Sequence, residues 1–221
     1  YFDMEFDGSV ERTKDRPLVT GIIKPSEALM LFFFLIFLSG LLLNWMNWLT
    51  IKVAAFGLVL ATFYPLTKRF FAIPQFFLGL AFSWGILMVS AAELNRINYI
   101  SIILFASCFF WILAYDTAYA MSDKEDDLKI GLRSSALTFG DKVVHFFICF
   151  QILSLAIWSS LGYILNMHPA FYMSSALWLY LITYQYNLIK SYDRQNCFLA
   201  FKNNNWVGVS LLTGSILGTS L

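Results

Sequence analysis

The stretch Phe70–Ala92, FFAIPQFFLGLAFSWGILMVSAA, holds 23 residues without a charged side chain. A helix needs about 20 mainly apolar residues to cross the hydrocarbon core of a bilayer, so this stretch predicts a transmembrane helix. The run is too long and too uniformly apolar for a strand of a membrane barrel, which would alternate. Across all 221 residues, 59% are hydrophobic and 13% are charged, and the mean hydropathy is +0.66, which excludes an ordinary soluble domain.

Six further runs have the same character, and together the runs predict an all-α, multi-pass transmembrane bundle of seven helices. The further runs are Ala28–Met46, Trp48–Thr67, Ile97–Tyr115, Val143–Met167, Pro169–Ile189 and Trp206–Leu221. The three cysteines are scattered and form no CxxC pair, so we expect neither a disulfide framework nor a zinc site.

Charge is distributed unequally between the two sides of this bundle. If the helices alternate in direction, 13 of the 15 basic residues fall on one side, and only Lys52 and Arg96 fall opposite. Such an excess marks the cytoplasmic side of a membrane. The acidic residues follow, with Glu93 as the exception, so any site built from them would be reached from the cytoplasm. The net charge of +1 says nothing about nucleic acid, because the charges are segregated rather than absent, and we expect no nucleic-acid partner for a membrane bundle of this kind.

Two acidic clusters lie beside apolar runs on that side. Asp3 and Asp7 are four residues apart, as are Asp123 and Asp127, and Asp116 precedes Asp123 by seven. On a helix each set would share one face. A single such pair is most often a solvated surface, but two clusters at one end of a membrane bundle favour a site. Carboxylate pairs hold Mg²⁺, often together with substrate phosphates, so the clusters predict a magnesium site that binds a diphosphate.

Basic residues near these clusters could bind the anionic parts of a substrate. The pair Lys68–Arg69 by itself is typical of a cytoplasmic topology signal. Beside carboxylates it could also contact phosphate or carboxylate groups, as could Arg12, Lys14 and Arg16. Arginine suits a planar carboxylate through its two-pronged donor geometry.

The motifs resemble those of the UbiA superfamily of intramembrane aromatic prenyltransferases, and most closely its 4-hydroxybenzoate polyprenyltransferases. Asp3 and Asp7 match the last two aspartates of that family's NDxxDxxxD signature. The matching segments that follow are RTKDRPL at 12–18, YPLTKR at 64–69, YDTAYAMSDKEDD at 115–127, and Phe201, Asn203, Asn204 and Gly208 near the end. The long stretch at 115–127 carries most of the specificity.

The resemblance implies a single integral membrane prenyltransferase domain over residues 1–221, with nine helices in the full-length protein. The two helices before the first signature, and its leading Asn-Asp, would precede Tyr1. We therefore expect the sequence to begin inside a longer protein, and this piece alone to be weak or inactive.

The reaction that the resemblance implies is the transfer of a polyprenyl group from polyprenyl diphosphate to the ring carbon ortho to the hydroxyl of 4-hydroxybenzoate, a step of ubiquinone biosynthesis. The implied Mg²⁺ ligands are Asp3, Asp7, Asp116, Asp123 and Asp127. The implied catalytic residues are Asp116, Asp123 and Arg69. Substrate contacts would come from Arg16, Tyr64, Lys68, Arg69 and Tyr119, with Arg69 favoured for the acceptor's carboxylate and the tyrosines for phosphate oxygens.

The resemblance also implies a bacterial inner membrane, with the active site on its cytoplasmic side and membrane lipids as partners. Donor chain length, the group that takes the ring proton and the oligomeric state stay open. The alternatives are a related prenyltransferase with a haem or naphthoate acceptor, a membrane transporter, or a lipid-binding protein without catalysis. A transport pathway predicts ionisable residues at mid-membrane depth, whereas the acids here cluster at one mouth.

Overall fold

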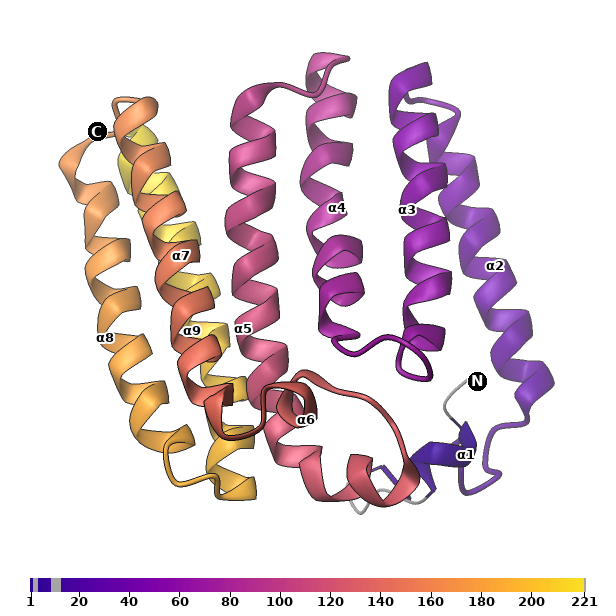
Figure 1. The fold of residues 1–221 in the computed structure, drawn as a ribbon. Helices are drawn as coiled ribbons and strands as arrows, with labels where there is room; N and C mark the ends of the chain where they lie inside the picture. Colours follow the sequence, from indigo (N-terminus) through magenta and orange to yellow (C-terminus); the bar gives the residue numbers. More distant parts are fainter. Residues whose placement is uncertain (2–3, 9–12, 221) are drawn as a thin grey trace.

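A computed structural model describes residues 1, 4–8 and 13–220 of the chain, and within them the regular structure is helical throughout. The short helix α1 (Met4–Asp7) is followed by long helices that alternate in direction (Figure 1). These are α2 (Pro25–Leu43), α3 (Trp48–Thr67), α4 (Gln75–Leu94), α5 (Tyr99–Ile130), α7 (Val143–Ile164), α8 (Tyr172–Ile189) and α9 (Arg194–Ser220). Short elements α6 (Ser135–Phe139), η1 (Gly140–Lys142) and η2 (Pro169–Phe171) connect some of them. The prediction of an all-α bundle with seven long helices is confirmed.

Five of the described helical segments are long and apolar enough to cross a membrane by length and composition: α2, α3, α4, α5 and the run from α6 through α7. Helices α8 and α9 lie alongside this group and are more polar than the sequence prediction assumed. Figure 1 shows the α1 segment, the end of α5, α6 and the α8–α9 turn at one end of the bundle. The expected gathering of the charged segments at one end is therefore present in the fold.

Side-chain caps and glycines set several helix limits. Asn47 and Asn98 accept hydrogen bonds from the backbone N–H groups of Thr50 and Ser101, which caps α3 and α5 at their N-termini. Helix α5 ends at Gly131, whose φ of 72° lies in the left-handed region that favours glycine. Figure 1 shows the α4–α5 turn, next to the capped start of α5, at the opposite end of the bundle from the charged end of α5.

Three predicted helix limits were wrong by five residues or more. The helix predicted over Phe70–Ala92 starts at Gln75, because Pro74 has no N–H and fits the start of a helix. Helix α5 continues past the predicted end at Tyr115 to Ile130, so the second acidic motif lies on the same helix as the apolar run. At about 1.5 Å per residue, its 32 residues span about 48 Å, and its charged end extends beyond a hydrocarbon core of about 30 Å.

The last helix begins at Arg194, twelve residues before the predicted start at Trp206. Its polar first turns were read as a loop, yet Cys197, Ala200 and Asn204 are buried. Helix α2, in contrast to the start of α9, has no buried residue although it is strongly apolar, and its Phe32 and Phe33 are exposed. Such a surface suits contact with lipid or with further helices.

Glycine at 214 allows α9 to approach α8 and η2 closely. A Cβ atom at this position would overlap the side chain of Ser174 and come within 3.2 Å of the Phe171 carbonyl oxygen. Ser174 cannot move freely, because its hydroxyl donates to that carbonyl (2.6 Å) and accepts from Trp158 Nε1 (3.1 Å).

We predict that Gly214→Ala lowers the free energy of unfolding in detergent by about 1–3 kcal/mol, the usual cost of overpacking. Gly85→Ala is the matched control, because nothing lies within 4 Å of a Cβ there. It should leave the thermal midpoint unchanged or slightly raised. Equal midpoints for the two variants would contradict the close packing of α9 on α8.

Candidate functional site

The end of α5 carries three carboxylates on one face. Asp123 is buried, and Asp116 and Asp127 are partly buried. Their spacing of seven and four residues repeats with the helical turn. The three carboxylates are close enough to repel one another, since the negative charge of Asp123 acts on both Asp116 and Asp127. The predicted second cluster is therefore assembled.

Burial and repulsion work against ionisation of this cluster. Burial raises the pKa of Asp127 to about 6, and the negative charge of Asp123 adds to the rise. Lys68, at the end of α3, opposes the rise because its positive charge lies near both Asp116 and Asp127. The predicted residue Lys68 is thus brought to the carboxylates.

Gln75, at the start of α4, joins this cluster to α6. It forms a side-chain hydrogen bond with Asp116, and its Oε1 accepts from the backbone N–H of Ser135 at 2.9 Å. Ser135 Oγ also donates to Thr117 Oγ1 at 3.0 Å. These bonds fix Asp116 between α4 and α6. The sequence analysis assigned no role to Gln75, although a polar residue early in an apolar run was a usable signal.

Arg194 is a second residue that the sequence analysis missed. Its Nη2 lies 2.5 Å from Asp126 Oδ2 and 3.8 Å from Asp123 Oδ1. It joins the first turn of α9 to the end of α5, and it places a guanidinium at the edge of the carboxylate cluster. No local pattern identifies this role, because the partners are 68 and 71 residues away in the sequence.

The first acidic motif is only partly within the described residues. Asp3 lies outside them. Asp7 accepts a hydrogen bond from Arg16 Nη1 at 2.7 Å, so this predicted substrate ligand is paired with a predicted metal ligand. Figure 1 shows α1 at the same end of the bundle as the charged part of α5.

The remaining predicted substrate ligands lie on α3, the turn after it, and α5. Tyr64 is partly buried near the end of α3, and Arg69 follows that helix with an exposed side chain. Tyr119 is partly buried on α5, where its ring centroid is 5.0 Å from that of Phe201.

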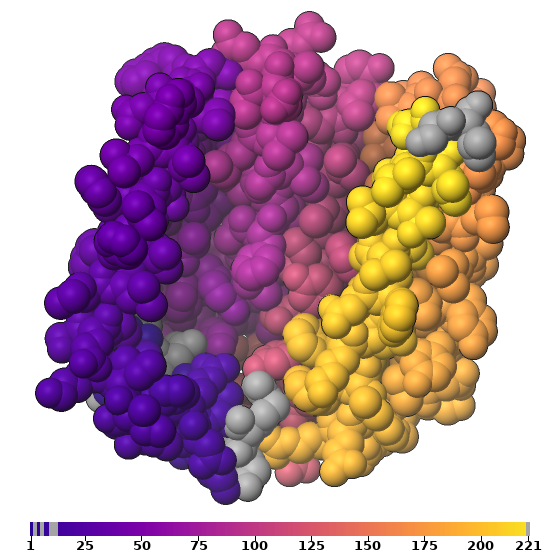
Figure 2. All heavy atoms as spheres, turned by 180° about the vertical axis from the view of Figure 1, so that it is seen from behind, coloured from indigo at the N-terminus to yellow at the C-terminus, as the bar shows by residue number. Residues whose placement is uncertain are grey.

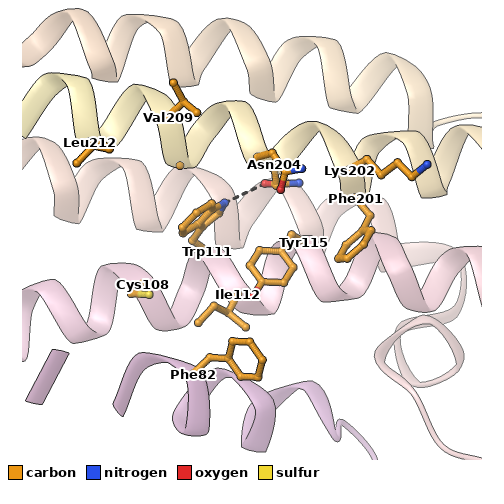
Figure 3. A pocket seen from close by; sticks show the side chains of 12 residues that line it. Phe82, Cys108, Trp111, Ile112, Tyr115, Phe201, Lys202, Asn204, Val209 and Leu212 are labelled. Atoms are coloured by element: carbon orange, nitrogen blue, oxygen red, sulfur yellow. Dashed lines mark hydrogen bonds between the residues drawn. The ribbon is translucent and has the colours of Figure 1, made fainter. Parts of the chain in front are cut away.

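A cavity of about 640 Å³ lies between α4, α5 and α9. Figure 3 shows Trp111, Tyr115 and Phe201 among its walls, with Leu212 toward one end and Lys202 toward the other. The face between α9 and the N-terminal helices is hollowed (Figure 2). The lining is mainly apolar and aromatic, as in sites that take an apolar ligand.

An aromatic row on α5 runs from this cavity toward the acidic end of the helix. Trp111, Tyr115 and Tyr119 recur every fourth residue on α5. Ring centroids are 5.7 Å apart between Trp111 and Tyr115 and 5.9 Å apart between Tyr115 and Phe201. The arrangement can hold a ligand whose long apolar part lies in the cavity and whose polar part lies at the acidic end.

The donor atoms of the acidic end fit a hard divalent cation in their chemistry. Asp116, Asp123 and Asp127 offer only oxygen ligands, and a bound cation would relieve their repulsion. The hydroxyl oxygen of Ser134 is buried near Asp127 and makes no bond of normal hydrogen-bond geometry among the described residues. No group of three or more His, Cys, Asp or Glu side chains within the described part of the chain is already arranged to hold a metal ion. The described aspartates Asp7, Asp116, Asp123 and Asp127 therefore do not form a ready metal site, and the joint chelation by five aspartates stays a prediction because Asp3 lies outside the described residues.

Known proteins resemble the chain along almost its whole length. The model of the UbiA prenyltransferase family matches residues 1–208. Curated proteins called 4-hydroxybenzoate octaprenyltransferase are 45% identical in both Nitrosospira multiformis and Dechloromonas aromatica. The matches cover 98% of this chain and 75% and 74% of those proteins. The solved apo structure of a UbiA homolog from Aeropyrum pernix K1 has a TM-score of 0.80 at 22% identity, over 98% of this chain and 81% of that one.

We predict that Arg194→Gln lowers the free energy of unfolding by about 1–3 kcal/mol, because the buried Asp126 loses its closest cation. Lys129→Gln is the matched control, since Lys129 also faces Asp126, but at 3.8 Å and with its own side chain 72% exposed. Its effect should stay within about 0.5 kcal/mol. Denaturation in detergent would measure both variants, and an equal loss would contradict the role of Arg194.

We predict that stability without metal falls as pH rises through 6, because Asp127 holds its proton more tightly in the folded protein (pKa about 6) than in the unfolded chain (pKa about 3.9). With a chelator present, Asp127→Asn should raise the unfolding midpoint at pH 7.5 and reduce its change between pH 7.5 and 5. Asp141→Asn, at an exposed position, is the control and should change neither. If Asp127→Asn has the same unfolding midpoint as the wild type at pH 7.5, the raised pKa of Asp127 would be contradicted.

Proposed function

The chain belongs to the UbiA prenyltransferase family, and from this membership we propose that it transfers a polyprenyl group from polyprenyl diphosphate to 4-hydroxybenzoate in ubiquinone biosynthesis. The new bond would form at the ring carbon ortho to the hydroxyl. The choice of this acceptor rests on the two proteins that share 45% identity with this chain.

The observation that carries the proposal is that one helix, α5, both lines an apolar cavity and carries the acidic cluster near its end. A polyprenyl diphosphate is amphiphilic in the same sense, with a long apolar chain and a highly charged head. Tyr115 lines the cavity, and Tyr119, one turn nearer the end of α5, shares with it the ring contact to Phe201. A donor placed along this part of α5 would have its reactive carbon beside the aromatic row.

Magnesium would be held by Asp116, Asp123 and Asp127 on α5, together with Asp7 and Asp3 of the first motif, and would neutralise the charge of the departing diphosphate. Lys68 supports the same end, since its positive charge already lies near Asp116 and Asp127. Gln75 would keep the Asp116 carboxylate in a fixed orientation through its hydrogen bond. This pre-arrangement favours the developing charge without a reorganisation step.

The substrate contacts follow from position and charge. Arg69, exposed after the end of α3, would bind the acceptor's carboxylate through its planar donors. Tyr64 and Tyr119 would orient phosphate oxygens. Arg16 would bind the donor only after exchanging its contact with Asp7.

In the reaction, the bond between the allylic carbon and the diphosphate oxygen breaks, and its electron pair leaves with the diphosphate. A pair of ring π electrons forms the new carbon–carbon bond, and the ring carbon then loses its proton. Trp111, Tyr115 and Phe201 would exclude water from the allylic centre, because they form the walls of the adjoining cavity.

The protein is an integral membrane protein, and we propose the bacterial inner membrane as its location. The acidic end would face the cytoplasm, because the segments at that end hold 13 of the 15 basic residues. A water-soluble acceptor would then arrive from the cytoplasm, while the donor would arrive from the lipid.

We predict that membranes carrying the protein, given Mg²⁺, a polyprenyl diphosphate and labelled 4-hydroxybenzoate, form prenylated 4-hydroxybenzoate. Asp123→Asn should lower the rate on the order of 10²-fold or more, since it removes a proposed ligand of the Mg²⁺ that neutralises the departing diphosphate. Glu125→Gln is the matched control, because Glu125 is an exposed carboxylate two residues along the same helix, and it should retain the wild-type rate.

Product that forms in excess EDTA, or in Asp123→Asn at the wild-type rate, would overturn the metal-dependent mechanism. Transport of either compound across the membrane without a new carbon–carbon bond would overturn the proposed function.

A further inference from the structure

A chain of buried amides runs through the apolar interior of the bundle. Gln151 on α7 and Gln185 on α8 are fully buried, and Asn204 on α9 is 4% exposed. Gln151 Nε2 donates to Gln185 Oε1 at 2.9 Å and to Asn204 Oδ1 at 3.3 Å. We call these three residues the amide relay. Buried polar groups in an apolar interior are costly unless they are bonded, so the relay needs its partners.

Two tryptophans fix the direction of the relay. An indole N–H can only donate, so each amide oxygen that it meets must be an acceptor. Trp178 Nε1 donates to Gln151 Oε1 at 2.9 Å, and Trp111 Nε1 donates to Asn204 Oδ1 at 2.9 Å (Figure 3). The amide nitrogen of Asn204 is bonded as well, to the Ala200 carbonyl at 2.9 Å. Turning over one amide would therefore break bonds at both ends.

The relay reaches the cavity at Trp111. Figure 3 shows this indole between the end near Leu212 and the end near Phe201. Gly208 of α9 packs beside the ring, since a Cβ atom there would lie 3.4 Å from Trp111 Cη2, an ordinary van der Waals contact. Trp111 lies five residues before Asp116 on α5, about 7.5 Å along the helix axis. One cavity wall is thus held by Asn204, which also lines the cavity, and through Asn204 by Gln151, which does not.

We propose that Trp111 determines the fate of the activated prenyl group, and that the amide relay positions Trp111 for this role. The inference rests on the proposed function. An activated allylic carbon can bond to the acceptor ring, or it can bond to the oxygen of water, which loses a proton and gives a prenyl alcohol. Trp111, held against Tyr115 and Asn204, keeps the first isoprene units in place and water out. Gln151 and Gln185 act as positioning residues.

The test compares two products of the same donor. For wild-type and variant proteins in membranes, the ratio of prenyl alcohol to prenylated 4-hydroxybenzoate is measured with labelled donor. Gln151→Leu cuts the relay without changing a residue that lines the cavity. We expect it to raise the ratio by about fivefold, the change that the loss of one ordinary hydrogen bond would give. Trp111→Phe, which keeps a ring but loses the N–H, should raise it similarly.

Ser154→Ala is the matched control. Ser154 is also fully buried on α7, and its hydroxyl donates to the Ser107 carbonyl of α5 at 2.5 Å, but it is not bonded to the relay. It should lower stability without changing the product ratio. In the double variant Gln151→Leu, Trp111→Phe the two effects should not add, because both act through one ring. Equal ratios in Gln151→Leu and Ser154→Ala would overturn the proposal.

A second measurement separates this inference from the proposed function. With 5-fluorotryptophan incorporated, the ¹⁹F NMR signal of Trp111 is assigned by its absence in Trp111→Phe. Gln151→Leu should shift or broaden this signal and Ser154→Ala should not, whether or not the protein prenylates 4-hydroxybenzoate. An unchanged Trp111 signal in Gln151→Leu would show that the relay does not position the ring. The wild type could fail to make prenylated 4-hydroxybenzoate while Gln151→Leu still shifts the Trp111 signal. That result would overturn the proposed acceptor and the role of Trp111 in its prenylation. The positioning of Trp111 by the amide relay would still be supported.

Discussion

Lipid provides neither hydrogen bonds nor counter-ions, and this constraint determines where every polar group of the molecule can lie. Charged residues are confined to the ends of the bundle, and most of them gather at one end. The buried amides in the interior are bonded to one another and to indoles. The carboxylates of α5 lie at the boundary between these two environments, because α5 is long enough to carry them beyond the hydrocarbon core.

The same boundary gives the acidic end its chemistry. Burial makes ionisation of Asp127 costly, and the neighbouring Asp123 adds repulsion, so positive charge is favoured there. Lys68 and Arg194 supply part of it from α3 and α9, two elements far apart in the sequence. A folded state that keeps such repulsion trades stability for a binding function, as active sites commonly do.

Much of the architecture could be predicted from the sequence, since long uncharged runs have one stable solution in a membrane. The one-sided charge distribution gave the alternation of the helices, and the spacing of Asp116, Asp123 and Asp127 gave their common face. Helix limits were less predictable. The beginning of α9 is polar, and only its packing against α5 shows that residues such as Asn204 belong to a helix. Arg194, Gln75 and the amide relay escaped prediction because each acts through partners distant in the sequence, and a single sequence does not show such contacts.

The central claim is that the carboxylates at the end of α5 bind a divalent cation together with the diphosphate of a prenyl donor. The most direct measurement is titration of the purified protein with Mn²⁺, followed by electron paramagnetic resonance, with and without a non-hydrolysable prenyl diphosphate analogue. Linkage requires the analogue to raise Mn²⁺ affinity by the factor by which Mn²⁺ raises affinity for the analogue. The account predicts this mutual increase in the wild type and its loss in Asp123→Asn. An affinity for Mn²⁺ that changes neither with the analogue nor in Asp123→Asn would contradict the central claim.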